Sequence, residues 1–295
     1  MNTTETRVRL FAAIEGGSLF WSNEIATIGS DLVLERIIGN GYQTDKNSIG
    51  FISREIKNSN SQQLLAEIAA AGASFITPES ADWPTSLNDL IAPPIALVIK
   101  GSLNSGNKVS IVGTRNPSTY GARVASEFGA SFADNGWTVI SGGAYGIDTA
   151  AHRGALAGEG ITYAVLASGV CINYPAANDR LFNEISESGA LLSEVMPNVR
   201  AKPERFLARN RLIAALSLGT IVVEAAFRSG SLRTARDAAE IYRTVMAIPG
   251  PITSPTSDGC HRLIAERCAE IVTSANDAIE LMSPLAGTLS SDEFR

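Results

Sequence analysis

The sequence has few cysteines and lacks the common motifs of catalytic and cofactor-binding sites. Its three cysteines, Cys171, Cys260 and Cys268, are odd in number and include no C-x-x-C pair, so the sequence indicates neither a zinc ribbon nor a disulfide framework. No G-x-G-x-x-G motif and no Gly-Lys dipeptide occur, which disfavours dinucleotide-dependent enzymes and Walker-type hydrolases. The H-E-x-x-H and G-x-S-x-G motifs are missing as well. We therefore predict no enzymatic activity, no catalytic residue, no metal and no cofactor.

Long apolar segments are also missing. The N-terminus has charged residues ahead of a short apolar run, which is unlike a signal peptide. The longest uncharged run, residues 160–178, contains Gly169, Asn173 and Pro175 and fits a buried strand and loop better than a membrane helix. We therefore predict a cytoplasmic protein with no membrane contact.

The 295 residues are too many for one small domain. Residues 1–75 contain short segments typical of helices, at 7–15, 22–29, 30–41 and 62–73. A polar stretch without clear periodicity, residues 41–61, lies among them, and no element is assigned to it. We predict a small helical domain over residues 1–75, a larger domain over 76–285 and a polar tail over 286–295. The segment before residue 101 holds four prolines and an apolar run, and it is expected to add a strand to the larger domain.

From residue 109 onward, apolar β-branched runs alternate with helical stretches. Strands are predicted at 109–113, 138–142, 162–167, 190–195, 220–225, 244–250 and 270–274. Helices are predicted at 120–135, 147–157, 178–188, 206–218, 232–242 and 260–266. Runs that are apolar throughout fit strands covered on both faces, and the alternation implies right-handed crossovers. The predicted fold class is therefore α/β with a doubly wound, mainly parallel sheet, and ligands should bind at the carboxyl ends of its strands.

Two of these strand ends carry glycine-rich turns, at residues 113–115 and 141–143, and Gly146 follows the second turn at the start of a helix. Such a turn lets backbone N–H groups and a helix N-terminus face an anion. Tight packing of a helix on the sheet is the alternative explanation for the glycines. The next helix carries Asp148 and His152, which we interpret as support for the turn and not as a catalytic relay.

A third strand end carries Tyr174, Pro175 and Asn178. Asn178 or Asp179 can cap the following helix, which explains the polar residues there without a binding function.

Charge is unevenly distributed along the chain. If the net charge of minus 6 were evenly spread, it would disfavour a nucleic-acid partner. Residues 195–236, however, hold eight basic residues against Glu204 and Glu224, a local charge of plus 6, so the remainder carries minus 12. The basic residues are Arg200, Lys202, Arg205, Arg209, Arg211, Arg228, Arg233 and Arg236. Arginines suit phosphodiesters, and Phe206 or Tyr174 could offer a face for base stacking, although a solvated charged surface is the alternative.

Several long motifs resemble the DNA-processing protein A family, also called DprA or Smf, over residues 72–272. They are SGGAYGIDTAAHRGAL, YPAAN, LLSEV, ERFLARNRLIAALS, VVEAAFRSGSLRTA and AIPGPITSPTSDGCHRLI, in this order. The preceding segment also fits the family pattern, with Asp82-Trp83-Pro84, Leu90, Pro93-Pro94 and Gly101.

The resemblance implies an extended Rossmann-like domain that binds single-stranded DNA, forms homodimers and loads the RecA recombinase during natural transformation. It also implies a small N-terminal domain similar to a sterile-alpha-motif module, although residues 15–24 depart from the family's Gly-rich turn. Too few residues follow Val272 for the winged helix that many members carry, so none is expected. Position by position, the resemblance implies a DNA- or phosphate-binding role for Gly113, Thr114, Arg115, Ser141, Gly142, Gly143, Gly146, Lys202, Arg205, Arg209, Asn210, Arg211, Ser229, Gly230 and Ser231.

Two other functions stay open at this point. The core of the family is similar to that of phosphoribohydrolases, and Glu224 after a predicted strand could stabilise an oxocarbenium-like ribose during nucleotide cleavage. A Gly-Gly turn is missing before Thr220, which disfavours this alternative. A pocket that senses a nucleotide-derived signal is the other possibility.

Overall fold

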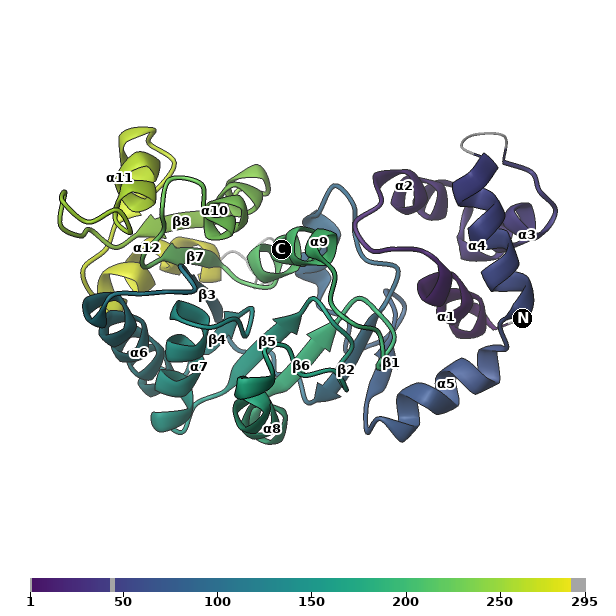
Figure 1. Cartoon of the computed structure of the whole chain (residues 1–295), viewed down its shortest axis with the longest axis horizontal. Coiled ribbons are helices and arrows are strands. Elements are labelled where there is room, and N and C mark those ends of the chain that lie inside the picture. The colour runs from purple at the N-terminus through teal and green to yellow at the C-terminus, as the bar shows by residue number, and fades with distance from the viewer. Residues whose placement is uncertain (1, 43–45, 288–295) are drawn as a thin grey trace, which may run out of the picture. The chain divides into compact units, whose positions relative to one another are not determined.

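A computed structural model describes residues 2–42 and 46–287 of the chain (Figure 1). The chain divides into two compact units, which are described separately. The first unit comprises residues 1–100, 166–172 and 192–209, and the second comprises 101–165, 173–191 and 210–295. The domain boundaries at residues 75 and 285 stay predictions. Of the predicted tail, residues 288–295 lie outside the described part of the chain.

The first unit begins with five helices. They are α1 (Thr3–Ala13), α2 (Leu19–Ile28), α3 (Ser30–Ile38), α4 (Lys46–Asn58) and α5 (Ser61–Ala70). Four of them, α1, α2, α3 and α5, overlap the short segments that were predicted to be helical. Helix α1 starts with a capping box, in which the Asn2 side chain accepts from the Thr4 N–H and the Glu5 carboxylate accepts from the Asn2 N–H. Helices α3, α4 and α5 all contact α1, so this helix is the centre of the group.

Helix α4 lies in the polar stretch to which the sequence assigned no element. Its Ile49, Ile52 and Ile56 are buried, and their spacing of three and four residues places them on one face of the helix. Gly50 and the surrounding polar residues hide this pattern when the stretch is judged by composition alone. The helix is stabilised by packing on α1 and α3 and not by the intrinsic preference of its residues.

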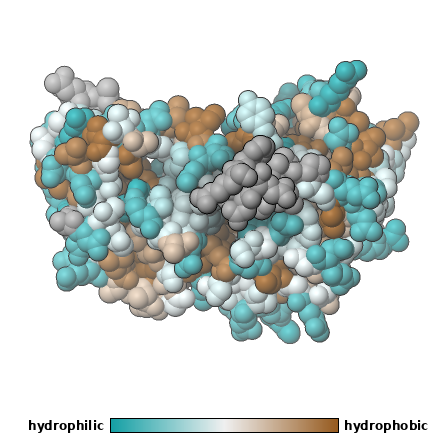
Figure 2. Space-filling view, turned by 180° about the vertical axis from the view of Figure 1, so that it is seen from behind, coloured by the Kyte–Doolittle hydropathy of each residue, from teal (hydrophilic) through white to brown (hydrophobic). Residues whose placement is uncertain are grey.

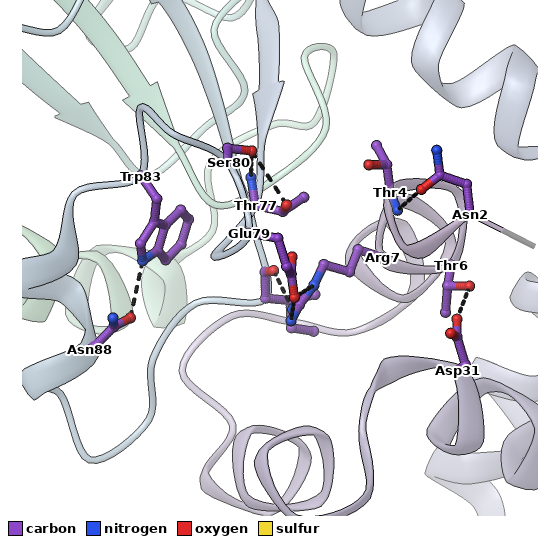
Figure 3. Close-up of polar contacts among 11 residues, drawn as sticks. Asn2, Thr4, Thr6, Arg7, Asp31, Thr77, Glu79, Ser80, Trp83 and Asn88 are labelled. Atoms are coloured by element: carbon purple, nitrogen blue, oxygen red, sulfur yellow. Dashed lines mark hydrogen bonds and ion pairs between the residues drawn. The ribbon is translucent and has the colours of Figure 1, made fainter.

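Arg7 joins α1 to the segment that follows the helices (Figure 3). This segment contains β1 (Ser74–Ile76) and β2 (Leu97–Gly101), which pair antiparallel, and a short 3₁₀ helix, η1 (Thr85–Asp89), lies between them. The buried Arg7 guanidinium donates to Glu79 Oε1 at 2.6 Å and to the Ile95 carbonyl at 2.9 Å. A buried charge is tolerated because it has both an ionic and a backbone partner.

The strands form a nine-stranded sheet in the order β1-β2-β6-β5-β4-β3-β7-β8-β9. The seven further strands are β3 (Lys108–Val112), β4 (Thr138–Ser141), β5 (Thr162–Leu166), β6 (Ala190–Ser193), β7 (Gly219–Val222), β8 (Thr244–Ala247) and β9 (Glu270–Ile271). In the second unit, β5, β4, β3, β7, β8 and β9 are joined by successive parallel pairings. The predicted α/β fold with a mainly parallel sheet is therefore confirmed.

Helices cover both faces of this parallel sheet (Figure 1). They are α6 (Thr119–Asp134), α7 (Ile147–Ala157), α8 (Asp179–Ser188), α9 (Pro203–Ala215), α10 (Gly230–Glu240), α11 (Asp258–Ala265) and α12 (Ala275–Gly287), with a 3₁₀ turn η2 (Ala176–Asn178) before α8. The core beneath α6, α7 and α12 is built from side chains such as Val109, Ile111, Phe128, Phe132 and Trp137. No helix within residues 2–42 and 46–287 combines the length and the apolar character that a membrane crossing requires.

Because the strands of the second unit run in parallel, their carboxyl ends share one edge, which we call the carboxyl edge. The segments that follow β3, β4 and β7 leave the sheet there, and each continues into a helix (Figure 1). The face shown in Figure 2 is mixed, with apolar side chains exposed in places between hydrophilic ones.

Candidate functional site

The glycine turn after β4 is held by a carboxylate of the protein itself. Asp148, in the first turn of α7, accepts hydrogen bonds from the Gly142 N–H at 3.2 Å and from the Ala144 N–H at 3.3 Å. The predicted supporting role of Asp148 is therefore confirmed. His152 is fully buried, and its Nδ1 lies 2.7 Å from the Thr162 hydroxyl on β5, so its ring packs against the sheet.

The turn after β3 contacts the turn after β4. The Ile147 N–H donates to the Thr114 carbonyl at 3.1 Å. Gly146 has φ +83°, and a Cβ at this position would lie 2.3 Å from the same carbonyl oxygen. Close approach of the backbone thus explains why a glycine stands at position 146, and it leaves Arg115 exposed on the carboxyl edge beside the contact.

Glu224, which follows β7, caps helix α6. Its carboxylate is buried and accepts from the Ser118 N–H at 2.9 Å and from the Ser118 hydroxyl at 2.6 Å. Ser118 is the N-cap of α6, and a Cβ on Gly121 in the first turn would lie 2.3 Å from the Glu224 carboxylate. Both carboxylate oxygens of Glu224 therefore hold the N-cap residue of α6, which gives this buried glutamate a structural role.

Asn178 has a role that the sequence did not reveal. Of the two predicted caps, Asn178 and Asp179, Asn178 is the N-cap residue of α8, but its side chain makes no capping hydrogen bond. The buried amide instead donates to the Gly143 carbonyl at 3.0 Å and to the Thr149 hydroxyl at 2.8 Å. Asn178 thereby ties the segment that carries Tyr174 to the glycine turn after β4. The only signal in the sequence was an asparagine three residues after a proline that follows a strand.

Two of the predicted basic site residues form ion pairs in the first unit. Arg205 contacts the Glu15 carboxylate in a bidentate manner, at 2.8 Å through Nε and 2.5 Å through Nη2. Lys202 lies 3.8 Å from the same carboxylate. The hydrogen bond from Arg205 holds the pKa of Glu15 below its ordinary value, against the opposing effect of burial. The local charge of plus 6 is thus partly neutralised by a residue far away in the sequence.

Helix α9 carries the next three predicted site residues, Arg209, Asn210 and Arg211. Arg209 is buried and lines a small pocket of the first unit together with Glu15, Glu194 and Arg205. Asn210 belongs to the second unit, where its side-chain amide donates to the Gly230 carbonyl at 3.3 Å. Arg211, in the same unit, is half-buried.

The predicted loop at residues 229–231 begins helix α10. Ser229 is the N-cap of α10, and its hydroxyl accepts from the Ser231 N–H at 3.4 Å. One further arginine of the basic stretch, Arg233, pairs with Asp237 at 2.6 Å. Because α10 is the first helix after β7, its N-terminus lies on the carboxyl edge. Backbone N–H groups at a helix N-terminus favour an anion.

The structure brings the predicted residues together in three groups. In the second unit, the turns at 113–115 and 141–146 contact each other, and Asn210 contacts the loop at 229–231. Lys202, Arg205 and Arg209 belong to the first unit. Ser141 is buried, and its hydroxyl donates to the Ile111 carbonyl, so its side chain serves the sheet. As DNA contacts, all fifteen residues stay predictions.

The three cysteines are free thiols, and Cys260 is buried. Within residues 2–42 and 46–287, no group of three or more His, Cys, Asp or Glu side chains is arranged so that it could hold a metal ion.

The model of the DNA recombination-mediator protein A family matches residues 74–283. The chain belongs to this family. The family assignment confirms the resemblance to DprA and Smf proteins. One member of the family, the DNA processing protein DprA of Mycobacterium tuberculosis, is 41% identical over 239 residues, which cover 76% of this chain. The match spans 61% of the length of that relative.

Two solved structures of DNA processing protein A have the same fold. The structure from Streptococcus pneumoniae matches with a TM-score of 0.81 and 33% identity, over 92% of this chain and 95% of that chain. The structure from Helicobacter pylori matches with a TM-score of 0.65 and 29% identity, over 74% of this chain and 98% of that chain. The latter gives insight into the single-stranded DNA binding mode of the Helicobacter pylori protein.

Proposed function

We propose that this chain binds single-stranded DNA at the carboxyl edge of its second unit and acts as a recombination mediator. The observation that carries the proposal is the exposed Arg115 beside two glycine turns in contact, in a chain of the DNA recombination-mediator family. The Helicobacter pylori relative, a binder of single-stranded DNA, supports the same ligand.

Hydrogen bonds in the glycine turn support a choice among the groups proposed to meet the DNA backbone. The N–H groups of Gly142 and Ala144 already donate to Asp148, so they are not expected to bind phosphate. Arg115 on the first turn and Arg228 after β7 are exposed on the carboxyl edge, and helix α10 begins there. Guanidinium groups and helix N-termini both favour phosphate. We therefore assign the main phosphate contacts to the rim of the edge and not to the interior of the glycine turn.

The finer parts of the proposal concern partners. We propose that the chain forms a homodimer through its Rossmann-like part, protects incoming single strands and loads RecA recombinase onto them during natural transformation. These expectations depend on the family resemblance. Light scattering of the purified chain tests the dimer, and RecA filament formation on strands covered by a single-strand-binding protein tests the loading.

Fluorescence anisotropy with a labelled oligonucleotide tests the central part of the proposal. We expect the single strand to bind more tightly than the duplex, with an affinity that falls steeply as salt rises, because bound cations are released from the phosphates. Arg115→Gln should weaken binding and reduce the slope of log K against log salt by about 0.7 for one lost phosphate contact.

Arg267→Gln is a matched control for this experiment. Arg267 is also exposed, and its substitution removes the same charge, but it lies just before β9, at the amino ends of the parallel strands. If both variants bind like the unmodified chain, the assignment of Arg115 to the DNA site is wrong. If the unmodified chain binds neither ligand at low salt, the proposed function is wrong.

A further inference from the structure

Three aromatic side chains in loops of the carboxyl edge are about half exposed, although most large apolar side chains of the second unit are buried. A fourth, Tyr120 at the start of α6, is less exposed, and its hydroxyl donates to the Pro249 carbonyl at 3.0 Å. Tyr145 follows β4 and is 49% exposed, Tyr174 precedes α8 and is 51% exposed, and Phe227 follows β7 and is 49% exposed. All three belong to the second unit. A single exposed aromatic residue needs no explanation, but one on each of three segments at the same edge does.

The contacts of these segments place Tyr145 and Tyr174 on neighbouring loops. Tyr145 lies in the glycine turn itself, between two residues whose conformations are fixed by Asp148 and by the contact with Thr114. The segment of Tyr174 is tied to the same turn by the hydrogen bond from Asn178 to the Gly143 carbonyl. Both tyrosines are thus presented by segments with fixed backbones, which limits the entropy lost when a ligand stacks on them.

Phe227 lies on the other side of β3, because β3 pairs with β4 on one side and with β7 on the other. The Arg262 guanidinium covers its ring at 4.5 Å from the centroid, and Arg262 is itself paired with Glu266. One face of this ring therefore has a cationic partner, and the exposed half of the side chain remains accessible to a second planar group.

The charges on the same edge indicate what the rings bind. Arg115 lies between the tyrosine loops and the β7 loop in strand order, and Arg228 follows Phe227 directly. Flat apolar faces next to arginines fit an unpaired nucleic-acid strand, whose bases stack on the rings while its phosphates contact the guanidinium groups. Bases in a duplex are already stacked on each other and paired, so their faces are not available in this way.

We propose that Tyr145, Tyr174 and Phe227 form a stacking platform for unpaired bases and that this platform determines the preference for single-stranded over double-stranded DNA. The inference rests on the proposed function, since it assigns the source of selectivity to the same edge. Arg115 and the helix N-termini would then supply affinity for any phosphate backbone, and the rings would supply the discrimination.

Leucine substitutions test the platform, since leucine retains an apolar side chain but removes the flat ring. Binding of Tyr145→Leu and Tyr174→Leu is compared for three ligands, a normal single strand, an abasic strand of the same length and charge, and a duplex. We expect each variant to bind the normal strand about fivefold or more weakly and to bind the abasic strand unchanged. Phe51→Leu is the control, because Phe51 is 52% exposed on α4 of the first unit and lies outside the carboxyl edge.

The outcomes separate the platform from the proposed function. If the unmodified chain binds normal and abasic strands equally well and the leucine variants match Phe51→Leu, the platform is refuted while DNA binding at the edge stands. Equal losses on normal and abasic strands would also refute it, because they would show a change in the backbone contacts. If the unmodified chain binds none of the three ligands, both the function and the platform are wrong.

Discussion

The contact between the two glycine turns predicts a large effect of a single methyl group at Gly146. This residue has φ +83° and ψ −124°, a conformation that alanine adopts only under strain. The Cβ of an alanine would also lie 2.3 Å from the Thr114 carbonyl oxygen and 2.7 Å from the Arg115 carbonyl carbon. These are backbone atoms, so no side-chain rotation can relieve the overlap.

The backbone strain and the steric overlap of the added Cβ can each be given a magnitude. The backbone strain costs about 1–3 kcal/mol, and forcing an extra carbon into a packed site costs about 1–3 kcal/mol. Gly146→Ala should therefore destabilise the chain by about 2–6 kcal/mol, a large share of the stability of a typical domain. Because the displaced atoms belong to Thr114 and Arg115, the same variant should also bind single-stranded DNA more weakly.

Denaturant unfolding of the chain measures this effect, and Gly50→Ala provides the control. Gly50 lies within helix α4, and a Cβ there meets no atom within 4 Å. Alanine at this helical position should stabilise the chain by about 0.5–1 kcal/mol. If Gly146→Ala unfolds at the same denaturant concentration as the unmodified chain, the two turns are not in the described contact and the account of the edge fails.

Three further predictions concern carboxylates. Asp148→Asn should lower the unfolding free energy by about 1–3 kcal/mol, since two N–H groups lose a charged acceptor. An unchanged midpoint in a denaturant titration would contradict the role of Asp148 in the turn. The lowered pKa of Glu15 means that its pair with Arg205 stabilises the fold above the ordinary value of 4.5 and that this stability is lost as the pH falls further. Glu15→Gln should thus be less stable than the unmodified chain by about 1 kcal/mol or less near neutral pH, as Glu15 is largely exposed, and the gap in melting temperature should close in acid. Incubation with nucleoside monophosphates should release no free base in chromatography, and release that Glu224→Gln abolishes would refute a purely capping role.

Local patterns in the sequence were sufficient for most of the fold. Helix α7 occupies the predicted residues 147–157, because a glycine turn before it and an apolar stripe along it mark its limits. The parallel strands were recognisable from short apolar runs that need cover on both faces. Helix α4 was not recognisable, since its three isoleucines stabilise it only through contact with α1 and α3.

The site was harder to predict than the fold, because its contacts join residues that are far apart in the chain. Arg205 and Glu15 are 190 positions apart, and Glu224 and Ser118 are 106 positions apart. The sequence identifies the types of residue that suit a phosphate ligand, but not which of them already have a partner in the protein. The pairing of Arg205 and the capping role of Glu224 could be known only from the folded chain.

Photochemical crosslinking of a single-stranded oligonucleotide to the full chain, followed by mass spectrometry of the peptides, tests the central claim most directly. The account predicts crosslinks in the segments of the carboxyl edge, at residues 113–120, 142–146, 173–178 and 223–231. Crosslinks confined to the helices at residues 3–70, or to the opposite edge of the sheet near Arg267, would contradict it.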